Sequence, residues 1–461
     1  MVLKKFIGDK AFYRKVMTIT IPILIQNVIT NFVNLIDNVM VGRLGTEPMS
    51  GVAIVNQLLF IFNLCIFGAI SGAGIFTAQY HGKGDHEGIR FTFRIKIIVS
   101  VAVTALFSLA FIFFGPQLIS LFLHEGQESL DLAATLAHGS DYFYVMLIGL
   151  LPFAISQCYA GTLKETGETM LPMKAGVAAV LVNLCLNYVF IYGKFGMPAM
   201  GVVGAAVATV ISRVVECLIV LIWTHKHKAI CEFIVGAYRS LYVPKELVIN
   251  VAKKGLPLMA NEVLWSVGMT TLSQCYSVRG LEAISASNIS STVSHLFFCA
   301  MFAFGNAISI IVGHLLGSGD LKRAKDEDNK LIFCSIVVCL AVGIVMGILS
   351  PFVPDLYNTT DLVKELATKF LLVSSVLLPF NAFANSTYFT LRSGGQTGVT
   401  FIFDSGYIWV ICVPVAFILS RFTGLPIFPL YAIVSALDIL KCFIGAYLLK
   451  KGTWLRSLVN D

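Results

Sequence analysis

Three acidic residues stand inside long apolar stretches of this chain, with no basic residue three or four positions away: Asp37, Glu262 and Asp404. On a helix, side chains at those spacings lie on the same face, so a local counter-ion would be found there. A charged group that faces lipid is costly and commonly binds an ion, a proton or a substrate. These three acids are therefore our leading candidates for chemistry.

Two other acids in apolar stretches have a basic residue three positions away. Arg213 precedes Glu216, and Asp438 precedes Lys441. Each pair can neutralise itself on one helix face, so we expect both pairs to be structural.

A stripe of amides accompanies Asp37. Asn27, Asn31, Asn34 and Asn38 recur at steps of four, three and four, which predicts that they share a helix face with Asp37. Such a stripe faces either a cavity or another helix, where amides also serve simply as interhelical hydrogen bonds. We interpret the first three amides, together with Glu262 and Asp404, as a pathway for a substrate or a proton.

Further polar residues follow in two later apolar stretches. Asn183 and Asn187 lie one helical turn apart, and Thr209 lies in the next stretch. If these helices pack beside the first, Asp37 gains three neighbours that carry oxygen atoms. One carboxylate with neutral oxygens suits Na⁺, whereas a proton needs only a buried carboxylate. We predict a cation site from these four residues, with Asp37 as the Na⁺ ligand; the alternative is that the amides only fix helix packing.

The elements that must position these residues are membrane-spanning helices. Hydrophobic residues make up 57% of the 461-residue chain and charged residues 13%, and the mean hydropathy is +0.83. A span needs about 20 apolar residues, and in lipid its backbone must satisfy its own hydrogen bonds, which favours helices. Twelve such stretches are expected at 16–41, 52–80, 92–114, 134–160, 170–192, 200–223, 250–278, 286–315, 330–352, 362–390, 397–419 and 427–449.

The chain is an internal repeat. Residues 22–85 match 257–320 at a constant offset of 235, and Leu163-Lys164 recurs as Leu391-Arg392. Pro22 and Pro257 are expected in the first turns of their helices. Six spans per half make the two repeats parallel, which predicts two six-helix bundles, 1–223 and 250–461, joined by a linker at 224–249.

The distribution of basic residues predicts the orientation. With the N-terminus inside, most Lys and Arg fall in inner segments, as in the stretch that holds Lys83, Arg90, Arg94 and Lys96. We therefore expect a multi-pass protein of the inner (plasma) membrane with both termini in the cytoplasm. The net charge of +7 is then a sign of topology rather than of nucleic-acid binding.

The sequence also excludes some classes. No phosphate-binding G-x-x-x-x-G-K-[ST] loop occurs, which disfavours an ATP-driven pump. The eleven cysteines are scattered without a CxxC pair, as is typical of apolar filler in helix interfaces. We expect no cofactor, only a transported Na⁺ or H⁺.

The chain resembles the prokaryotic branch of the multidrug and toxic-compound extrusion (MATE) transporters over nearly its whole length. The resemblance rests on four segments: Asn34 to Gly45, Gln79 to Gly84, Asn183 to Gly193 and Gly201 to Thr209. It implies a V-shaped pair of six-helix bundles that exports amphipathic, often cationic compounds as a cation antiporter. By the same resemblance Asp37 is the cation-coupling carboxylate, with Asn183, Asn187 and Thr209 beside it, and Glu262 and Asp404 serve the second half.

Two alternatives stay open at this point. A lipid-linked oligosaccharide flippase of the same superfamily would present a basic cavity, and an integral membrane transferase would need clustered catalytic residues at one membrane face. We favour efflux of lipophilic cations by a monomer in the lipid bilayer, with no enzyme activity and no nucleic-acid partner.

Overall fold

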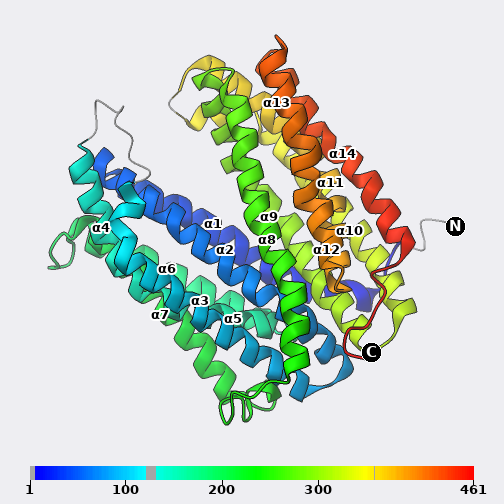
Figure 1. The fold of residues 1–461 in the computed structure, drawn as a ribbon. Coiled ribbons are helices and arrows are strands. Elements are labelled where there is room, and N and C mark those ends of the chain that lie inside the picture. The colour runs from blue at the N-terminus through cyan, green and yellow to red at the C-terminus, as the bar shows by residue number, and fades with distance from the viewer. Residues whose placement is uncertain (1–5, 121–130, 358, 461) are drawn as a thin grey trace. The chain divides into compact units, whose positions relative to one another are not determined.

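The computed structural model describes residues 6–120, 131–357 and 359–460, and in these residues all regular structure is helical (Figure 1). The short helices are η2 (Glu232–Ile234), η3 (Pro354–Leu356), η4 (Ile402–Gly406) and η5 (Ile408–Cys412). The longer helices are α1 (Lys10–Gly42), α2 (Thr46–Lys83), α3 (His86–Ser120), α4 (Leu132–Ile148), α5 (Leu150–Glu165), α6 (Met170–Tyr192), α7 (Gly201–Lys226), α8 (Lys245–Ser277), α9 (Leu281–Gly317), α10 (Leu321–Leu349), α11 (Asp361–Ser393), α12 (Thr397–Phe401), α13 (Val413–Phe422) and α14 (Ile427–Lys451).

A helix or a run of consecutive helices lies at each of the twelve predicted positions. In the described part of the chain, 10 helices are long and apolar enough to cross a membrane, or 11 if α4 and α5, bent by 46°, form one span. The remaining predicted span is α8, where Asn261 and Glu262 lower the hydropathy. The chain is thus an all-helical, multi-pass membrane protein.

The repeat is reproduced in the helix boundaries. Three pairs of helices begin 235 residues apart: α1 and α8 at Lys10 and Lys245, α2 and α9 at Thr46 and Leu281, and α3 and α10 at His86 and Leu321. The offset found in the sequence therefore describes duplicated helices, not only duplicated motifs.

One expectation about these helices was wrong. Pro22 and Pro257 lie in the interiors of α1 and α8, not in their first turns. The reason is that α1 begins before its apolar stretch, where the Asp9 carboxylate accepts a hydrogen bond from the backbone N–H of Phe12 at 2.7 Å. A proline in the interior removes one backbone donor, which membrane helices tolerate better than soluble ones.

Contacts divide the chain into two compact units. The N-unit comprises Ile25–Thr77 and His86–Val251. The C-unit comprises the stretch up to Leu24, Ala78–Asp85 and the chain from Ala252 onward. The start of α1 and the end of α2, which belong to the first half of the repeat, thus make their contacts in the C-unit.

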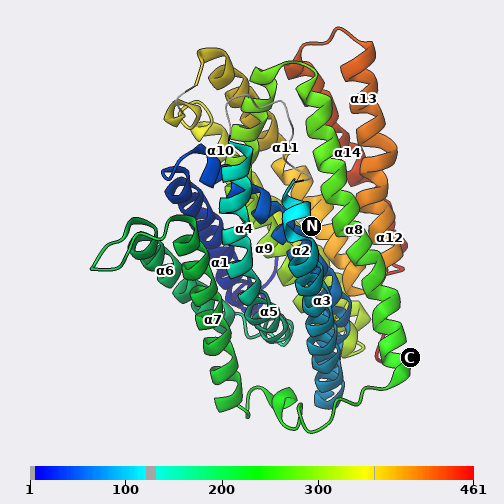
Figure 2. The same ribbon diagram turned by 60° about the vertical axis from the view of Figure 1, so that its left-hand side comes forward.

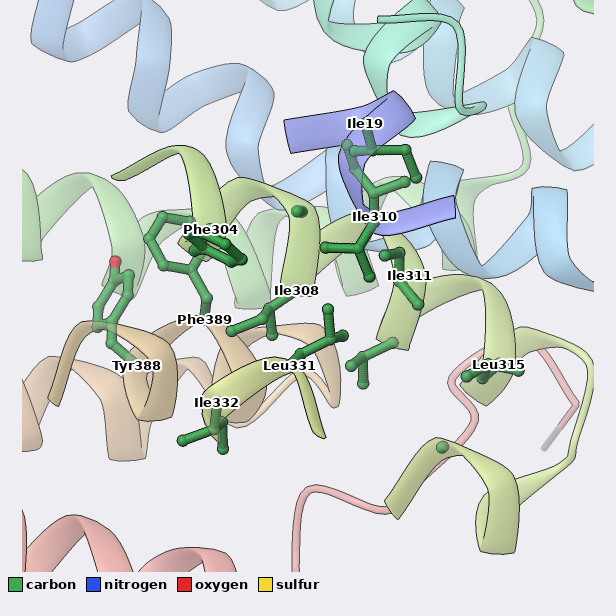
Figure 3. Packing of buried hydrophobic residues seen from close by; sticks show 14 of the residues in the cluster. Ile19, Phe304, Ile308, Ile310, Ile311, Leu315, Leu331, Ile332, Tyr388 and Phe389 are labelled. Carbon is green, nitrogen blue, oxygen red and sulfur yellow. The ribbon is translucent and has the colours of Figure 1, made fainter. Parts of the chain in front are cut away.

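The core of the C-unit explains this division. Buried residues of α1 at helical spacing, including Val16, Ile19 and Ile23, pack against α9 residues such as Ile308 and Ile311. Figure 3 shows Ile19 beside Ile310 of α9 in this cluster. The apolar face of the first turns of α1 is therefore buried by the second half of the sequence.

Two glycines related by the repeat let α2 and α9 approach closely within the C-unit. A Cβ atom on Gly82 would lie 1.9 Å from the carbonyl oxygen of His314, and one on Gly317 would lie 1.8 Å from that of Gln79. Adding 235 converts Gly82 into Gly317 and Gln79 into His314, so the two contacts are equivalent. The helices therefore cross with local two-fold symmetry, and small residues permit the crossing.

The eleventh predicted span, 397–419, is irregular. The segments α12, η4, η5 and α13 follow one another along a single path from Thr397 to Phe422 (Figure 2). Both η4 and η5 are π-helical. An inserted π turn changes the direction of the side chains around it and often occurs at functional sites.

Candidate functional site

The structure brings together the four residues of the predicted cation site, all within the N-unit. Asn187, which is 1% exposed on α6, donates from Nδ2 to Oδ1 of Asp37 at 2.8 Å. The amide of Asn183 fits in two orientations. In the first, its Oδ1 accepts from Nδ2 of Asn187 at 3.2 Å and its Nδ2 donates to Oγ1 of Thr209 at 3.3 Å. In the second, its Nδ2 donates to the two Asp37 oxygens at 2.8 and 3.1 Å, and its Oδ1 takes the Thr209 hydroxyl proton in place of the Ala205 carbonyl. The four residues therefore lie together, as the helix spacings in the sequence suggested, and their role as a cation site stays a prediction.

The packing of α6 against α7 positions these side chains. A Cβ atom on Gly204 would lie 2.7 Å from the carbonyl carbon of Phe190, so the two helices touch through their backbones. Asn183 and Asn187 share one face of α6, one turn apart, and Thr209 lies on α7 one turn after Ala205, whose carbonyl accepts its hydroxyl proton at 3.0 Å.

The orientation of the amides differs from the sequence expectation. The amide nitrogen of Asn187, not its oxygen, faces the Asp37 carboxylate, and the nitrogen of Asn183 faces it in the second of its two orientations. Oδ1 of Asn187 is buried and has no hydrogen-bond partner. Because rotation of an amide by half a turn exchanges donor and acceptor, the same residues can either donate to an ionised carboxylate or present oxygens to a cation.

Asp37 is surrounded by neutral groups. No Lys or Arg forms an ion pair with it in residues 6–120, 131–357 and 359–460. Tyr142 of α4 lies close enough to interact electrostatically with both Asp37 and Arg213. Sequence analysis missed Tyr142, because a tyrosine in an apolar span gives no distinctive signal.

The amide stripe of α1 lies beside Asp37 rather than in line with it. At about 100° per residue, Asn27, Asn31 and Asn34 are roughly 60–120° around the helix from Asp37. Asn27 and Asn31 are half-buried and Asn34 is exposed. The predicted stripe is therefore a separate, neighbouring face, and the expectation that it shares the face of Asp37 was wrong.

Arg213 and Glu216 interact electrostatically, but no direct ion pair joins them in the described residues. Lys164 of α5 also acts on Glu216, and the guanidinium carbon of Arg213 lies 5.0 Å from the centre of the Phe153 ring. The predicted pair is thus part of a wider group of three half-buried charges in the N-unit.

Asp404 has a counter-ion that its local spacing does not reveal. Nζ of Lys441 on α14 lies 2.7 Å from Oδ1 of Asp404. Lys441 also interacts with Asp438, the partner expected from sequence. The interpretation of Asp404 as an unpaired acid was therefore wrong, because its partner comes from another helix.

Asn261 of α8 is a buried residue that sequence analysis missed. Its Nδ2 donates to Oδ2 of Asp404 at 3.1 Å. Its Oδ1 accepts from the backbone N–H of Ser405 at 3.2 Å and from the Ser405 hydroxyl at 2.7 Å. Asn261 thereby holds the π-helical segment η4 in place and orients Asp404. Its position next to Glu262 in an apolar span was the available signal.

Glu262 completes the polar group of the C-unit. It is half-buried on α8 and interacts electrostatically with Arg392 of α11 and with Asp404. The C-unit thus combines its two predicted acids with the buried Arg392 and the half-buried Lys441, whereas Asp37 in the N-unit is held by amides.

Known proteins resemble this chain over most of its length. The MatE family profile matches residues 22–189 and 257–440. The chain is 26% identical to the probable multidrug resistance protein YoeA of Bacillus subtilis, covering 90% of this chain and 88% of the relative. It is 24% identical to the probable multidrug resistance protein NorM of Thermotoga maritima, covering 97% and 94%.

Solved structures share the fold. An outward-facing multidrug resistance MATE family transporter of the MOP superfamily aligns with a TM-score of 0.87 at 20% identity, covering 98% of this chain and 97% of that one. A MOP superfamily transporter from Pyrococcus furiosus, described by a reverse polarity of its binding pocket, aligns with a TM-score of 0.83 at 20% identity over the same shares of the two chains.

Proposed function

Because the chain belongs to the MatE family and is therefore a membrane transporter rather than an enzyme, we propose that it exports amphipathic small molecules, lipophilic cations among them, in exchange for inward-moving Na⁺ or H⁺. The observation that carries this proposal is the Asp37 site, one carboxylate held by two amides with no ion pair in the described chain. The names of its relatives as multidrug resistance proteins support it.

Asp37 is the coupling carboxylate in this proposal. The amide nitrogen of Asn187, joined by that of Asn183 in its second orientation, stabilises its ionised form. Binding of Na⁺ requires the amides to turn so that their oxygens, with that of Thr209, face the ion. Binding of H⁺ requires only one new acceptor, and Oδ1 of Asn187 is buried and available for it. Either ion removes the negative charge and so changes which conformation is favoured.

The substrate and proton pathway is proposed to use Glu262 and the amide face formed by Asn27, Asn31 and Asn34. An acid with partial access to solvent, such as Glu262, can attract a lipophilic cation. Asp404 is assigned to the same pathway through Glu262, with which it interacts electrostatically. Its charge is largely balanced by Lys441.

We further propose a monomer of the plasma membrane with lobes 1–223 and 250–461 and a linker at 224–249. The excess of Lys and Arg in the inner segments supports cytoplasmic termini. A protease added to membrane vesicles tests this orientation. We expect it to digest a terminal tag in inverted vesicles but not in right-side-out vesicles.

The function is tested by efflux of a fluorescent lipophilic cation from proteoliposomes, with Na⁺ and H⁺ gradients imposed separately. Wild-type protein is expected to respond to one of the gradients, and Asp37→Asn is expected to reduce export to the level of empty liposomes. The matched control is Asp326→Asn, which changes an exposed acid that is paired with Lys330. Normal export by Asp37→Asn would contradict the assignment of the coupling site.

The outcome of no export under either gradient favours the flippase alternative. The specific observation on that side is the buried Arg392 together with the half-buried Lys441 in the C-unit, because cations suit an anionic lipid-linked substrate. Movement of a labelled lipid-linked oligosaccharide between leaflets would then replace drug export as the measured activity.

A further inference from the structure

Asp328 is a buried acid outside the groups described so far. It lies on α10 within the C-unit and is 1% exposed. The residues on the same helix face, Ala324, Leu331 and Ile332, belong to the apolar core of that unit. Figure 3 shows Leu331 and Ile332 among the isoleucines of α9 in this cluster. The carboxyl group is therefore directed into surroundings where a negative charge is expensive.

Neighbouring charges have other partners. In the part of the chain that the structure describes, Asp328 takes part in no ion pair, and the Thr390 hydroxyl is its one side-chain partner. The charged and titratable groups of α1, α9, α10 and α11 nearby interact elsewhere: Lys15 and Arg323 with Glu327, Lys330 with Asp326, Arg392 with Glu262, and His314 with His81.

The hydrogen bonds indicate where the proton is. Oγ1 of Thr390 lies 2.6 Å from Oδ1 of Asp328 and 3.0 Å from the carbonyl oxygen of Ser386. Both of these are acceptors if Asp328 is ionised, yet a hydroxyl has one proton to donate. If Asp328 is protonated, it donates to Thr390, and Thr390 donates to Ser386. In this arrangement both short contacts of Oγ1 are hydrogen bonds, whereas an ionised Asp328 leaves only one of them a hydrogen bond.

The first half of the repeat offers an independent comparison. The offset that relates Leu163-Lys164 to Leu391-Arg392 also relates Thr162 to Thr390. Thr162 likewise donates to a carbonyl one turn back, that of Cys158, at 2.9 Å. Its buried partner is the ammonium group of Lys96 at 3.1 Å, which forms an ion pair with Glu165. The N-unit thus balances its buried charge with a second side chain, and the C-unit has no such side chain beside Asp328 among the residues described.

We propose that Asp328 is a second proton-binding site, separate from the Asp37 site, and that its proton is exchanged during the transport cycle. Exchange is feasible because Asp328 lies seven residues after the start of α10, about 10 Å along the helix. On α11, one turn from Thr390, Oγ of Ser386 is buried without a hydrogen-bond partner, so a further polar atom lies next to this chain of contacts. The exchange step rests on the proposed transport function, but the presence of the proton does not.

The proton is tested by infrared difference spectroscopy of the purified full-length protein. At neutral pH the C=O stretching band of a protonated carboxylic acid is expected in wild type and lost in Asp328→Asn. Asp326→Asn, the same change two positions away on an exposed, ion-paired residue, is expected to leave the band unchanged. Identical spectra for wild type and Asp328→Asn would overturn the proposal, whether or not the protein transports anything. If Asp328→Asn does not fold, Thr390→Val serves instead and is expected to shift the band by removing the hydrogen bond.

The exchange is tested by following pH in weakly buffered proteoliposomes during substrate export. Asp328→Asn is expected to move fewer protons per substrate exported than wild type or Asp326→Asn. A lost infrared band with unchanged proton movement would show a permanently protonated, structural Asp328 and would overturn the exchange step.

Discussion

The two halves of this chain share a helical scaffold and two cationic positions, yet they use those cations differently. The offset of 228 that relates Lys164 to Arg392 also relates Arg213 to Lys441. In the N-unit both cations act on Glu216, which leaves Asp37 to the amides of α6. In the C-unit, Lys441 binds Asp404 directly and Arg392 acts on Glu262.

The difference shows how a duplicated fold acquires two kinds of site. The cations keep their places in the repeat, and the acids have moved. An acid next to a cation stays ionised, because its negative charge is already balanced. An acid held by neutral donors remains able to bind a cation, which is the property that coupling requires.

The largest effect is expected where the halves are equivalent. Gly82→Ala and Gly317→Ala each place a Cβ atom within 2 Å of a carbonyl oxygen across the crossing of α2 and α9. Both variants are expected to yield little folded protein, to a similar degree, when monodisperse protein is measured by size-exclusion chromatography. Gly398→Ala, which meets nothing within 4 Å, is the control. A severe defect in only one of the two variants would show that the crossing is not symmetric.

A smaller effect is expected where the halves differ in their ion pairs. Lys441→Met leaves the half-buried Asp404 without its counter-ion. Breaking a fully buried pair costs about 3–5 kcal/mol, so we expect a loss of folding free energy at or below the lower end of that range. Arg213→Met is expected to cost less, since Arg213 has no direct ion pair in the described chain. Thermal unfolding in detergent compares the two. The double variant Asp404→Asn, Lys441→Met is expected to recover part of the lost stability. If it recovers none, Lys441 stabilises the protein through packing rather than through its charge.

The smallest effect concerns the amide that holds Asp37. Asn187→Ala removes the 2.8 Å hydrogen bond to the carboxylate, and a hydrogen bond to a charged group contributes about 1.5–3 kcal/mol. We expect a loss of stability in this range, together with weaker binding of the coupling ion, measured by calorimetry with Na⁺ and by pH titration. Asn34→Ala changes an exposed amide and is expected to leave both quantities unaltered. Equal effects of the two variants would remove Asn187 from the site.

Much of this arrangement was predictable because its signals are local. Asn183 and Asn187 are one turn apart in an apolar span, and this spacing alone fixes a shared helix face. Glu262 and Asp404 stood out because each is an acid in an apolar span with no basic residue three or four positions away. The pairing of Asp404 with Lys441 was not predictable, because 37 positions separate the two residues and only the packing of α14 against η4 brings them together. Asp328 was missed because it follows a run of charged residues that is typical of an exposed helix end.

The sequence by itself determined the membrane environment, the twelve helical segments and the repeat, since these depend on composition, hydrophobic length and a constant offset along the chain. Tertiary structure decided which charges meet. It paired Lys441 with Asp404, turned the amide nitrogen of Asn187 toward Asp37, and enclosed Asp328 among apolar side chains. The physical reason is that the energy of a buried charge depends on the atoms within a few ångströms, and in a helical bundle most of those atoms belong to other helices.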